Sequence, residues 1–186
     1  DYGIVQDTLD ATRAMLRRAG SECDLIITCG GVSVGEADFV KPAVEAEGEL
    51  LMWRIAMKPG RPLAFGKVHS AGRTAAFIGL PGNPVSSFVT FVLFARPFIL
   101  KTQGMSRLAP QAIQARADFD WLEPDSRREF LRAKWNVDGG LDIYLTQDSA
   151  VLTSTVWADG LIDNPAKQVI KKGDYVKFLP YGEILR

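Results

Sequence analysis

The stretch Phe77-Ile78-Gly79-Leu80-Pro81-Gly82-Asn83-Pro84-Val85-Ser86-Ser87 is read as a buried strand, a tight turn and the start of a long helix. Asn83 is a good N-cap, and Pro84 falls at the first helical position, where its missing N–H costs nothing. Ser86 then stands in the first turn, beside free backbone N–H groups and the positive end of the helix dipole. A turn of this kind is typical of anion binding.

Two earlier loops have related chemistry. Thr28-Cys29-Gly30-Gly31-Val32-Ser33-Val34-Gly35 follows a short apolar strand, and its glycines let backbone N–H groups approach a ligand closely. Lys58-Pro59-Gly60-Arg61-Pro62 is a cationic loop stiffened by two prolines, in which Arg suits a bidentate oxyanion and Lys acts as a point charge. We predict that all three loops line one pocket for an anionic ligand. The alternatives are a strained glycine turn, a solvated basic turn and a merely rigid proline turn.

Two carboxylates flank these loops. Asp7 opens the first helix, and Asp38 closes the glycine-rich loop. On the sequence alone, an ordinary helix N-cap is the favoured interpretation of Asp7, and it is open for Asp38 as well. The other interpretation is that both side chains meet near the pocket and hold a divalent cation. Mg²⁺ takes one or two protein carboxylates when phosphate oxygens supply the remaining ligands, so this pair would suffice for a phosphorylated ligand.

Composition excludes several function classes. The 22 Lys and Arg residues balance 22 Asp and Glu residues, which removes a bulk electrostatic argument for nucleic acid. The apolar run 85–100 is broken by Arg96-Pro97 and is shorter than the roughly 20 residues that span a bilayer. We therefore expect a core helix in a cytoplasmic protein that has no contact with a membrane.

The reactive residue types are few. Cys23 and Cys29 lack the C-x-x-C spacing and adjoin an apolar strand, so buried free thiols are favoured over a redox or metal role. His69 is the one histidine and falls in a Gly/Ser turn, which excludes a His-based zinc site and a Ser/His/Asp triad.

Strands and helices alternate in the first part of the chain. The near-continuous apolar run 24–28 is typical of a parallel strand covered on both faces. We predict strands at 2–5, 50–57, 63–68 and 74–78, and helices at 7–19 (ended by Gly20), 39–46 and 84–102. This alternation favours a three-layer αβα domain over residues 1–104, with ligands bound at the C-terminal ends of the strands.

The hydrophobic pattern of the sequence changes after Gly104, where long helical periodicity disappears. Strands are predicted at 112–118, 128–137, 141–146 and 175–179, with a hairpin turn at Asp138-Gly139-Gly140 and either a short helix or a strand at 151–158. Residues 105–186 therefore read as a small, barrel-like β domain.

The three loops together resemble one family. Gly30-Gly31-Val32-Ser33-Val34-Gly35-Glu36-Ala37-Asp38, Met57-Lys58-Pro59-Gly60-Arg61-Pro62 and Gly79-Leu80-Pro81-Gly82-Asn83-Pro84-Val85-Ser86 match, in order and spacing, the molybdopterin molybdenumtransferase family, which includes the E domain of gephyrin. The resemblance covers essentially the whole chain and is weaker beyond about residue 105. It implies a molybdopterin-binding αβα domain that is truncated at its N-terminus, followed by the β domain, and leaves open whether this segment alone is active.

The resemblance implies a reaction and partners. Adenylylated molybdopterin (molybdopterin-AMP) is bound, molybdate is inserted at its dithiolene sulfurs, and AMP is released by hydrolysis of the pyrophosphate bond with help from Mg²⁺. Homodimerisation and an upstream molybdopterin adenylyltransferase are implied as well. By position, Asp7 and Asp38 would be catalytic and hold the metal, and Lys58 and Arg61 would be catalytic cations facing molybdate or phosphates. The substrate-binding residues would be Gly30, Gly31, Ser33, Gly35, Arg54, Pro81, Gly82, Asn83, Pro84 and Ser86.

Two other function classes are weighed against this enzyme. The fold of gephyrin can anchor receptor peptides, so a binding module is one alternative, although no extended tail or linker suggests that role here. A pterin-binding relative that catalyses adenylylation or nucleotide hydrolysis is the other. Such relatives share the glycine-rich loop and lack the paired K-P-G-R-P and L-P-G-N-P motifs.

Overall fold

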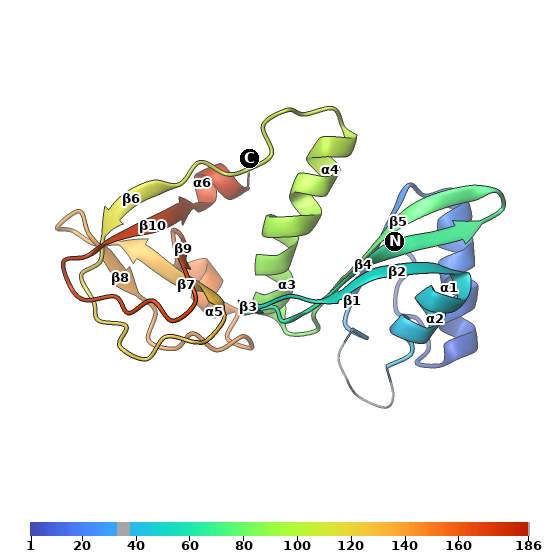
Figure 1. Ribbon diagram of the computed structural model, residues 1–186, viewed down its shortest axis with the longest axis horizontal. Helices are drawn as coiled ribbons and strands as arrows, with labels where there is room; N and C mark the ends of the chain where they lie inside the picture. Colours follow the sequence, from blue (N-terminus) through green and yellow to red (C-terminus); the bar gives the residue numbers. More distant parts are fainter. Residues whose placement is uncertain (33–37, 186) are drawn as a thin grey trace. The chain divides into compact units, whose positions relative to one another are not determined.

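The structure, a computed structural model, describes residues 1–32 and 38–185 (Figure 1). It divides into two compact units: unit 1 comprises Asp1–Ile55 and Arg61–Asn83, and unit 2 comprises Ala56–Gly60 and Pro84–Arg186. The chain therefore enters unit 2 briefly, returns to unit 1, and enters unit 2 again after Asn83. The predicted domain boundary near residue 104 stays a prediction.

Unit 1 is built on a four-stranded sheet with the strand order β1-β5-β4-β2. β1 (Leu25–Cys29) runs parallel to β5 (Arg73–Leu80), whereas β4 (Pro62–Ser70) is antiparallel to both β5 and β2 (Gly48–Arg54). The parallel pairing predicted for the apolar run 24–28 is confirmed, and the sheet as a whole is mixed. The strand predicted at 2–5 is wrong, because those residues have no regular structure.

Two helices cover one face of this sheet. α1 (Leu9–Glu22) packs on β4 and β5, and α2 (Val40–Glu47) packs beside α1 and on β2. Their apolar side chains bury against the sheet in one core that contains Leu16, Ala19, Ile26, Val44 and Phe77. Burial of this kind contributes most of the stability of such a layer. A helical layer on the other face stays a prediction.

Gly20 does not end the first helix, as the sequence predicted. A Cβ at Gly20 would lie 3.0 Å from Cγ1 of Val68 and 3.2 Å from Cβ of Ser70, so the helix backbone approaches β4 closely at this point. The helix continues to Glu22 because packing on the sheet offsets the unfavourable helix propensity of glycine.

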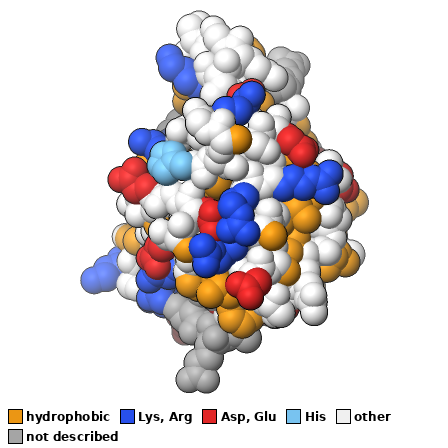
Figure 2. Space-filling view, turned by 90° about the vertical axis from the view of Figure 1, so that its right-hand side faces the viewer, with side chains coloured by type: hydrophobic (Ala, Val, Ile, Leu, Met, Phe, Trp, Pro, Cys, Tyr) orange, Lys and Arg blue, Asp and Glu red, His pale blue; other side chains and the backbone are white. Residues whose placement is uncertain are grey.

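Ion pairs link the two helices of unit 1. Basic and acidic side chains are interspersed on its surface (Figure 2). Glu47 on α2 accepts from Arg13 at 2.7 Å and from Arg17 at 2.6 Å, both on α1. Burial raises the pKa of Glu47, but the two guanidinium groups lower it further, and the net pKa lies below its ordinary value. These pairs fix α2 against α1.

A single helical stretch follows Pro84, as predicted. It consists of α3 (Pro84–Thr90), the π-helical segment η1 (Phe91–Ala95) and α4 (Arg96–Thr102). The Arg96 N–H donates to the Phe91 carbonyl, five residues back, immediately before Pro97, which has no N–H to donate. Among the described residues this stretch alone, with a mean hydropathy of 1.4, would be long and apolar enough to cross a membrane; buried core helices meet the same criterion.

Unit 2 contains a second sheet with the strand order β3-β7-β9-β10-β6. β8 pairs with the C-terminal end of β7, at Ala133–Trp135, whereas β3 pairs with its first two residues. The predicted strand 50–57 is thus wrong in extent, because Met57 and Lys58 form β3 in this second sheet. A bridge between Ala117 and Leu141 links the ends of β6 and β8, so that β7, β9, β10, β6 and β8 form a ring of neighbours. The elements are β3 (Met57–Lys58), β6 (Ile113–Arg116), β7 (Arg128–Trp135), β8 (Leu141–Ile143), α5 (Thr153–Trp157), β9 (Gly160–Asn164), β10 (Tyr175–Pro180) and α6 (Tyr181–Ile184).

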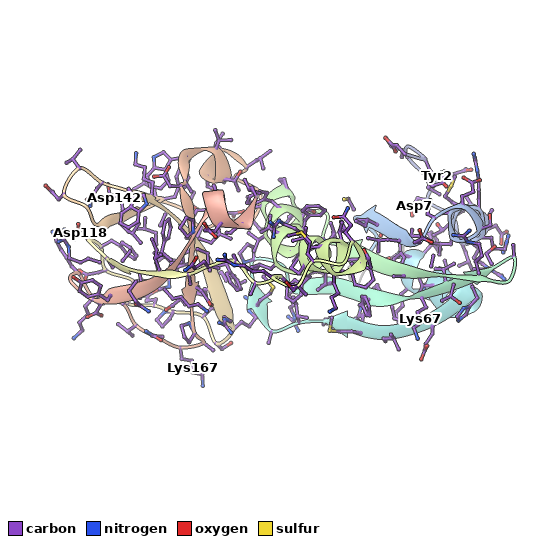
Figure 3. The ribbon with its side chains drawn as sticks, turned by 90° about the horizontal axis from the view of Figure 1, so that it is seen from above. Tyr2, Asp7, Lys67, Asp118, Asp142 and Lys167 are labelled. Atoms are coloured by element: carbon purple, nitrogen blue, oxygen red, sulfur yellow. The ribbon has the colours of Figure 1, made fainter. Side chains whose placement is uncertain are left out.

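The ring encloses small and branched apolar side chains, among them Ala115, Leu131, Ile162 and Phe178. The predicted hairpin between 128–137 and 141–146 is confirmed, with Trp135 opposite Leu141. Asn136 ties its turn, since its Nδ2 group donates to Asp118 at 2.8 Å and to Asp142 at 3.1 Å (Figure 3).

A buried arginine holds the segment after β8. Arg132 has an exposed fraction of 0%, and its guanidinium donates to Ser154 Oγ at 3.1 Å and to the Asp148 carbonyl at 3.0 Å. Burial lowers the pKa of Arg132 to about 10. Neutral oxygens therefore compensate its desolvation and fix α5 beside β7.

The substitution Gly48→Ala tests the packing of unit 1. A Cβ at this position would lie 2.0 Å from the carbonyl oxygen of Lys67, a backbone atom of the paired strand β4. We expect a loss of about 1–3 kcal/mol in the free energy of unfolding, measured by urea denaturation. Gly182→Ala is the control, because nothing lies within 4 Å of its new methyl group; an equal loss in both variants would contradict the packing argument.

Candidate functional site

The glycine-rich loop and the Leu80-Pro81-Gly82 turn lie side by side in unit 1. The Gly30 N–H donates to the Leu80 carbonyl at 2.9 Å. A Cβ on Gly82 would lie 3.6 Å from the Cα of Gly30. The parallel register of β1 with β5, which sets Cys29 opposite Leu80, brings the two strand ends to one edge of the sheet. Two of the three predicted loops are therefore adjacent.

Asp38 stands beside this pair of loops. Its Oδ1 atom accepts from the Val40 N–H at 3.3 Å, at the start of α2, and lies 3.7 Å from where a Cβ on Gly31 would be. Gly31 has a positive φ of 68°, and a side chain there would meet Val40 at 2.5 Å, so both the conformation and the space require glycine. Ser33 and Gly35, predicted to bind substrate, lie outside the described residues.

Asp7 is exposed just before α1 (Figure 3), and the N-cap of that helix is Thr8, whose Oγ1 accepts from the Ala11 N–H at 3.3 Å. Over residues 1–32 and 38–185, no group of three or more His, Cys, Asp or Glu side chains is placed to hold a metal. Asp7 and Asp38 could thus serve Mg²⁺ only together with oxygens from a phosphorylated ligand. Their pairing stays a prediction.

Arg54 and Arg61 lie at the same end of unit 1's sheet as Leu80, where β2 ends and β4 begins. Arg54 is opposite Pro62 at the end of β2, and the Ile55 N–H donates to the Arg61 carbonyl at 3.1 Å. Both side chains are exposed. Arg61 belongs to unit 1 and Lys58 to unit 2, so the two cations of one loop are held by different units.

Lys58 is already paired, which the sequence did not predict. Its Nζ atom lies 3.5 Å from Asp125 Oδ2 and 3.7 Å from Glu129 Oε1, and its side chain is 39% exposed. Sequence reasoning missed both carboxylates, although Glu129 alternates with Leu131 and Ala133 along an apolar strand. A carboxylate at an inward-facing position of that kind signals a buried partner.

Gly60 of the cationic loop packs on α3 within unit 2. Gly60 has a φ of 112°, and a Cβ there would meet Cγ2 of Thr90 at 2.5 Å. Thr90 Oγ1 donates to the Ser86 carbonyl at 2.7 Å, and the exposed fraction of Ser86 is 4%. The predicted hydroxyl donor is therefore buried on the side of α3 that carries Thr90.

The predicted site residues thus fall into two groups. Unit 1 places the glycine loop, the Leu80-Pro81-Gly82 turn, Arg54 and Arg61 at one end of its sheet, with Asp38 beside the glycine loop. Pro81 is buried, while Gly82 and Asn83 are exposed. Unit 2 brings together Lys58, Gly60 and the α3 residues, beginning at the exposed Pro84. A single pocket lined by all three loops stays a prediction.

Asp163 forms a further charged cluster in unit 2. It is 4% exposed as a side chain and accepts from Arg128 Nη2 at 2.7 Å and from Lys177 Nζ at 2.9 Å, on the two flanking strands. Burial raises the pKa of Asp163, but the hydrogen bonds from Arg128 and Lys177 lower it further, and the net pKa lies below its ordinary value.

Two family models match the chain: one described as a probable molybdopterin binding domain, over residues 1–101, and one described as the MoeA C-terminal region (domain IV), over residues 114–181. A molybdopterin molybdenumtransferase of Haemophilus influenzae is 41% identical over 74% of this chain and 33% of its own length. The molybdenum cofactor synthesis protein cinnamon of Drosophila melanogaster is 37% identical over 88% of this chain and 28% of its own length. The chain thus spans a third or less of these relatives.

Solved structures show the same fold. A molybdopterin biosynthesis MoeA protein from Pyrococcus horikoshii superposes with a TM-score of 0.75 and 26% identity, over 97% of this chain and 43% of that one. A molybdenum cofactor biosynthesis protein from Pyrococcus furiosus gives a TM-score of 0.74 and 25% identity, over 97% of this chain and 57% of that one. The predicted mixed α/β architecture with a separate C-terminal region is confirmed.

The pairing of Lys58 generates a stability prediction. Lys58→Met removes the ion-pair partner of the buried Glu129, so we expect unit 2 to lose about 1–3 kcal/mol of unfolding free energy. Adding Glu129→Gln removes the uncompensated charge and should recover most of that loss. Urea denaturation of the two single variants and the double variant measures this; additive losses would show that the two side chains do not interact.

Asp163 generates a pH prediction. Because its folded pKa is depressed, its stabilisation is present above the unfolded value of about 3.9 and is lost as pH falls through the folded pKa. We expect Asp163→Asn to lower the free energy of unfolding at pH 7 by about 1–3 kcal/mol, and the difference from wild type to shrink below about pH 4. Asp24→Asn, whose exposed carboxylate pairs with Arg73, is the control and should change stability little at any pH. A difference from wild type that does not shrink at all as pH falls below about 4 would contradict the assignment.

Proposed function

Because the chain belongs to the molybdopterin molybdenumtransferase family, we propose that it acts in molybdenum cofactor biosynthesis by inserting molybdate into adenylylated molybdopterin. The dithiolene sulfurs would bind molybdenum, and water would cleave the phosphoanhydride bond to release AMP. The chain spans a third or less of the length of these relatives, so the whole reaction is part of this proposal.

One observation supports the proposal above the others: the glycine loop and the Leu80-Pro81-Gly82 turn adjoin, with Asp38 beside them. Glycine at Gly31 and Gly82 leaves the backbone accessible where side chains would otherwise stand. Backbone groups at strand ends are suited to phosphates and other oxyanions. We assign this half of the site to the phosphate-bearing part of the substrate.

The cations have separate roles in this proposal. Arg61 is exposed and would attract the anionic substrate and molybdate by charge. Lys58 is neutralised by its two carboxylates, so it would act as a directed hydrogen-bond donor to the oxyanion. Mg²⁺ would come with the nucleotide phosphates, with Asp7 and Asp38 as candidate ligands, and we assign it no step.

The proposed substrate determines which reaction must come first. An upstream molybdopterin adenylyltransferase must supply the adenylylated pterin, because this reaction consumes it. We propose a cytoplasmic homodimer as the working form. A binding module without turnover is the alternative that the experiment must distinguish.

The test uses the full-length protein with adenylylated molybdopterin, Mg²⁺ and molybdate, and quantifies AMP by chromatography with and without molybdate. We expect molybdate-dependent release, and a fall of about tenfold or more in kcat/KM, or roughly 1.4 kcal/mol, for Asp38→Asn and Arg61→Gln. Lys67→Gln, an exposed lysine paired with Glu49, should stay within about twofold of wild type.

Two results would reject the proposal. Tight binding of the nucleotide without any AMP release would identify a binding module. Normal kcat/KM in both Asp38→Asn and Arg61→Gln would show that these loops do not form the site.

A further inference from the structure

We propose that Glu129 is a positioning residue, whose Oε1 atom holds the Lys58 ammonium in the direction from which it meets the oxyanion ligand. This inference rests on the proposed function for the role of Lys58 itself. It adds a carboxylate from the second family region to the machinery, at a position that none of the three loop motifs contains.

The backbone makes the two residues neighbours. β3 pairs in parallel with β7, with Met57 opposite Arg128 and Lys58 opposite Glu129. The Ala56 carbonyl accepts from the Arg128 N–H at 3.2 Å, which anchors the start of the pair. The separation of 3.7 Å between Lys58 Nζ and Glu129 Oε1 therefore follows from register, and does not depend on a chance meeting of long side chains.

The carboxylate of Glu129 is held by neutral donors. Its Oε2 atom accepts from Trp121 Nε1 at 2.9 Å and from Asn164 Nδ2 at 3.4 Å, and Asn164 also donates to the Gln168 carbonyl at 3.0 Å. Glu129 and Asn164 are each 1% exposed. This network fixes the orientation of the carboxylate before any ligand arrives.

The second oxygen is left for the ammonium. Within the described residues, Glu129 Oε1 is buried and has no hydrogen-bond donor; Lys58 forms an ion pair with it at 3.7 Å, while Arg127 acts on Glu129 only through its charge. A buried carboxylate oxygen without a donor is costly unless a charge compensates it. Lys58 supplies that charge while 39% of its side chain remains exposed, so the ammonium keeps an open side.

Asp125 is the competing partner, and it is less suited to the role. Arg127 donates to Asp125 Oδ1 through Nε and to Oδ2 through Nη2, both at 2.8 Å, and through its backbone N–H at 3.0 Å. These hydrogen bonds hold the pKa of Asp125 well below its ordinary range. Its charge is mostly satisfied by Arg127, and its side chain is 18% exposed, so screening weakens its pull on Lys58.

The arrangement determines what Lys58 can do. An ammonium has three N–H donors, and its ion pairs with Asp125 and Glu129 lie at 3.5 and 3.7 Å. The partly exposed side chain leaves donor capacity available to an oxyanion. Glu129 therefore converts a mobile charge on a long side chain into a donor of fixed direction, which reduces the entropy lost when the ligand binds.

Glu129→Gln is a sharp test because the network sets the orientation of the new amide. Trp121 Nε1 and Asn164 Nδ2 are donors, so the amide oxygen must face them and its NH₂ group must face Lys58. Two donors then oppose each other, and the ammonium is displaced without a change in side-chain size. Asp125→Asn and Glu49→Gln, the latter an exposed carboxylate of unit 1 paired with Lys67, are the matched controls.

The first readout does not require activity. The lysines of the full-length protein are reductively methylated with ¹³C-formaldehyde, and the Lys58 resonance is identified by its loss in Lys58→Met. We expect Glu129→Gln to shift and narrow this resonance, Asp125→Asn to move it less, and Glu49→Gln to leave it unchanged. An unmoved Lys58 resonance in Glu129→Gln would overturn the inference whatever the protein catalyses.

The second readout is kinetic. We expect Glu129→Gln to reduce kcat/KM for molybdate in the AMP-release assay by about tenfold or more, and to have less than about a twofold effect in the Lys58→Met background. A purely structural role would instead lower kcat/KM in both backgrounds. Wild-type kcat/KM in Glu129→Gln, with loss in Lys58→Met, would overturn this inference and leave the proposed function intact. Retained kcat/KM in Lys58→Met would reject the role of Lys58 as well.

Discussion

The short pairing of β3 with β7 determines where Lys58 lies. Met57 and Lys58 follow a strand of the first sheet and still pair with β7 of the second, in parallel and in a fixed register. Met57 is buried there, with an exposed fraction of 4%, and Lys58 is set beside Glu129. The main chain thereby places a cation next to a buried carboxylate, and the side chains have little freedom to arrange otherwise.

The features that local sequence controls were predictable. The apolar run ending at Cys29 predicted a buried parallel strand, and the Asn83-Pro84 pair predicted the helix start. Because parallel neighbours end at one edge of a sheet, the contact between the glycine loop and the Leu80-Pro81-Gly82 turn followed from those two predictions. The Asp138-Gly139-Gly140 turn likewise identified its hairpin from residue types alone.

The features that distant residues control were not predictable. Strand β9 (Gly160–Asn164) was missed because its Gly, Asp and Asn residues are typical of turns, and it becomes a strand through pairing on both sides. Gly20 resembled a helix stop in the sequence, and its close packing on β4 explains why the helix continues past it. Lys58 read as a free cation because its carboxylates come from a region that the pattern of the loop does not mention.

The passage of the chain through unit 2 at Ala56–Gly60, before its return at Arg61, has a practical consequence for anyone who divides this protein. A piece that begins at Pro84 would keep the five strands of the ring and lose the short strand that covers β7. The uncovered N–H and C=O groups of β7 would then be open to pairing with another molecule. A fragment cut at Pro84 is therefore expected to aggregate, whereas adding a separate peptide that spans residues 56–60 should reduce its aggregation.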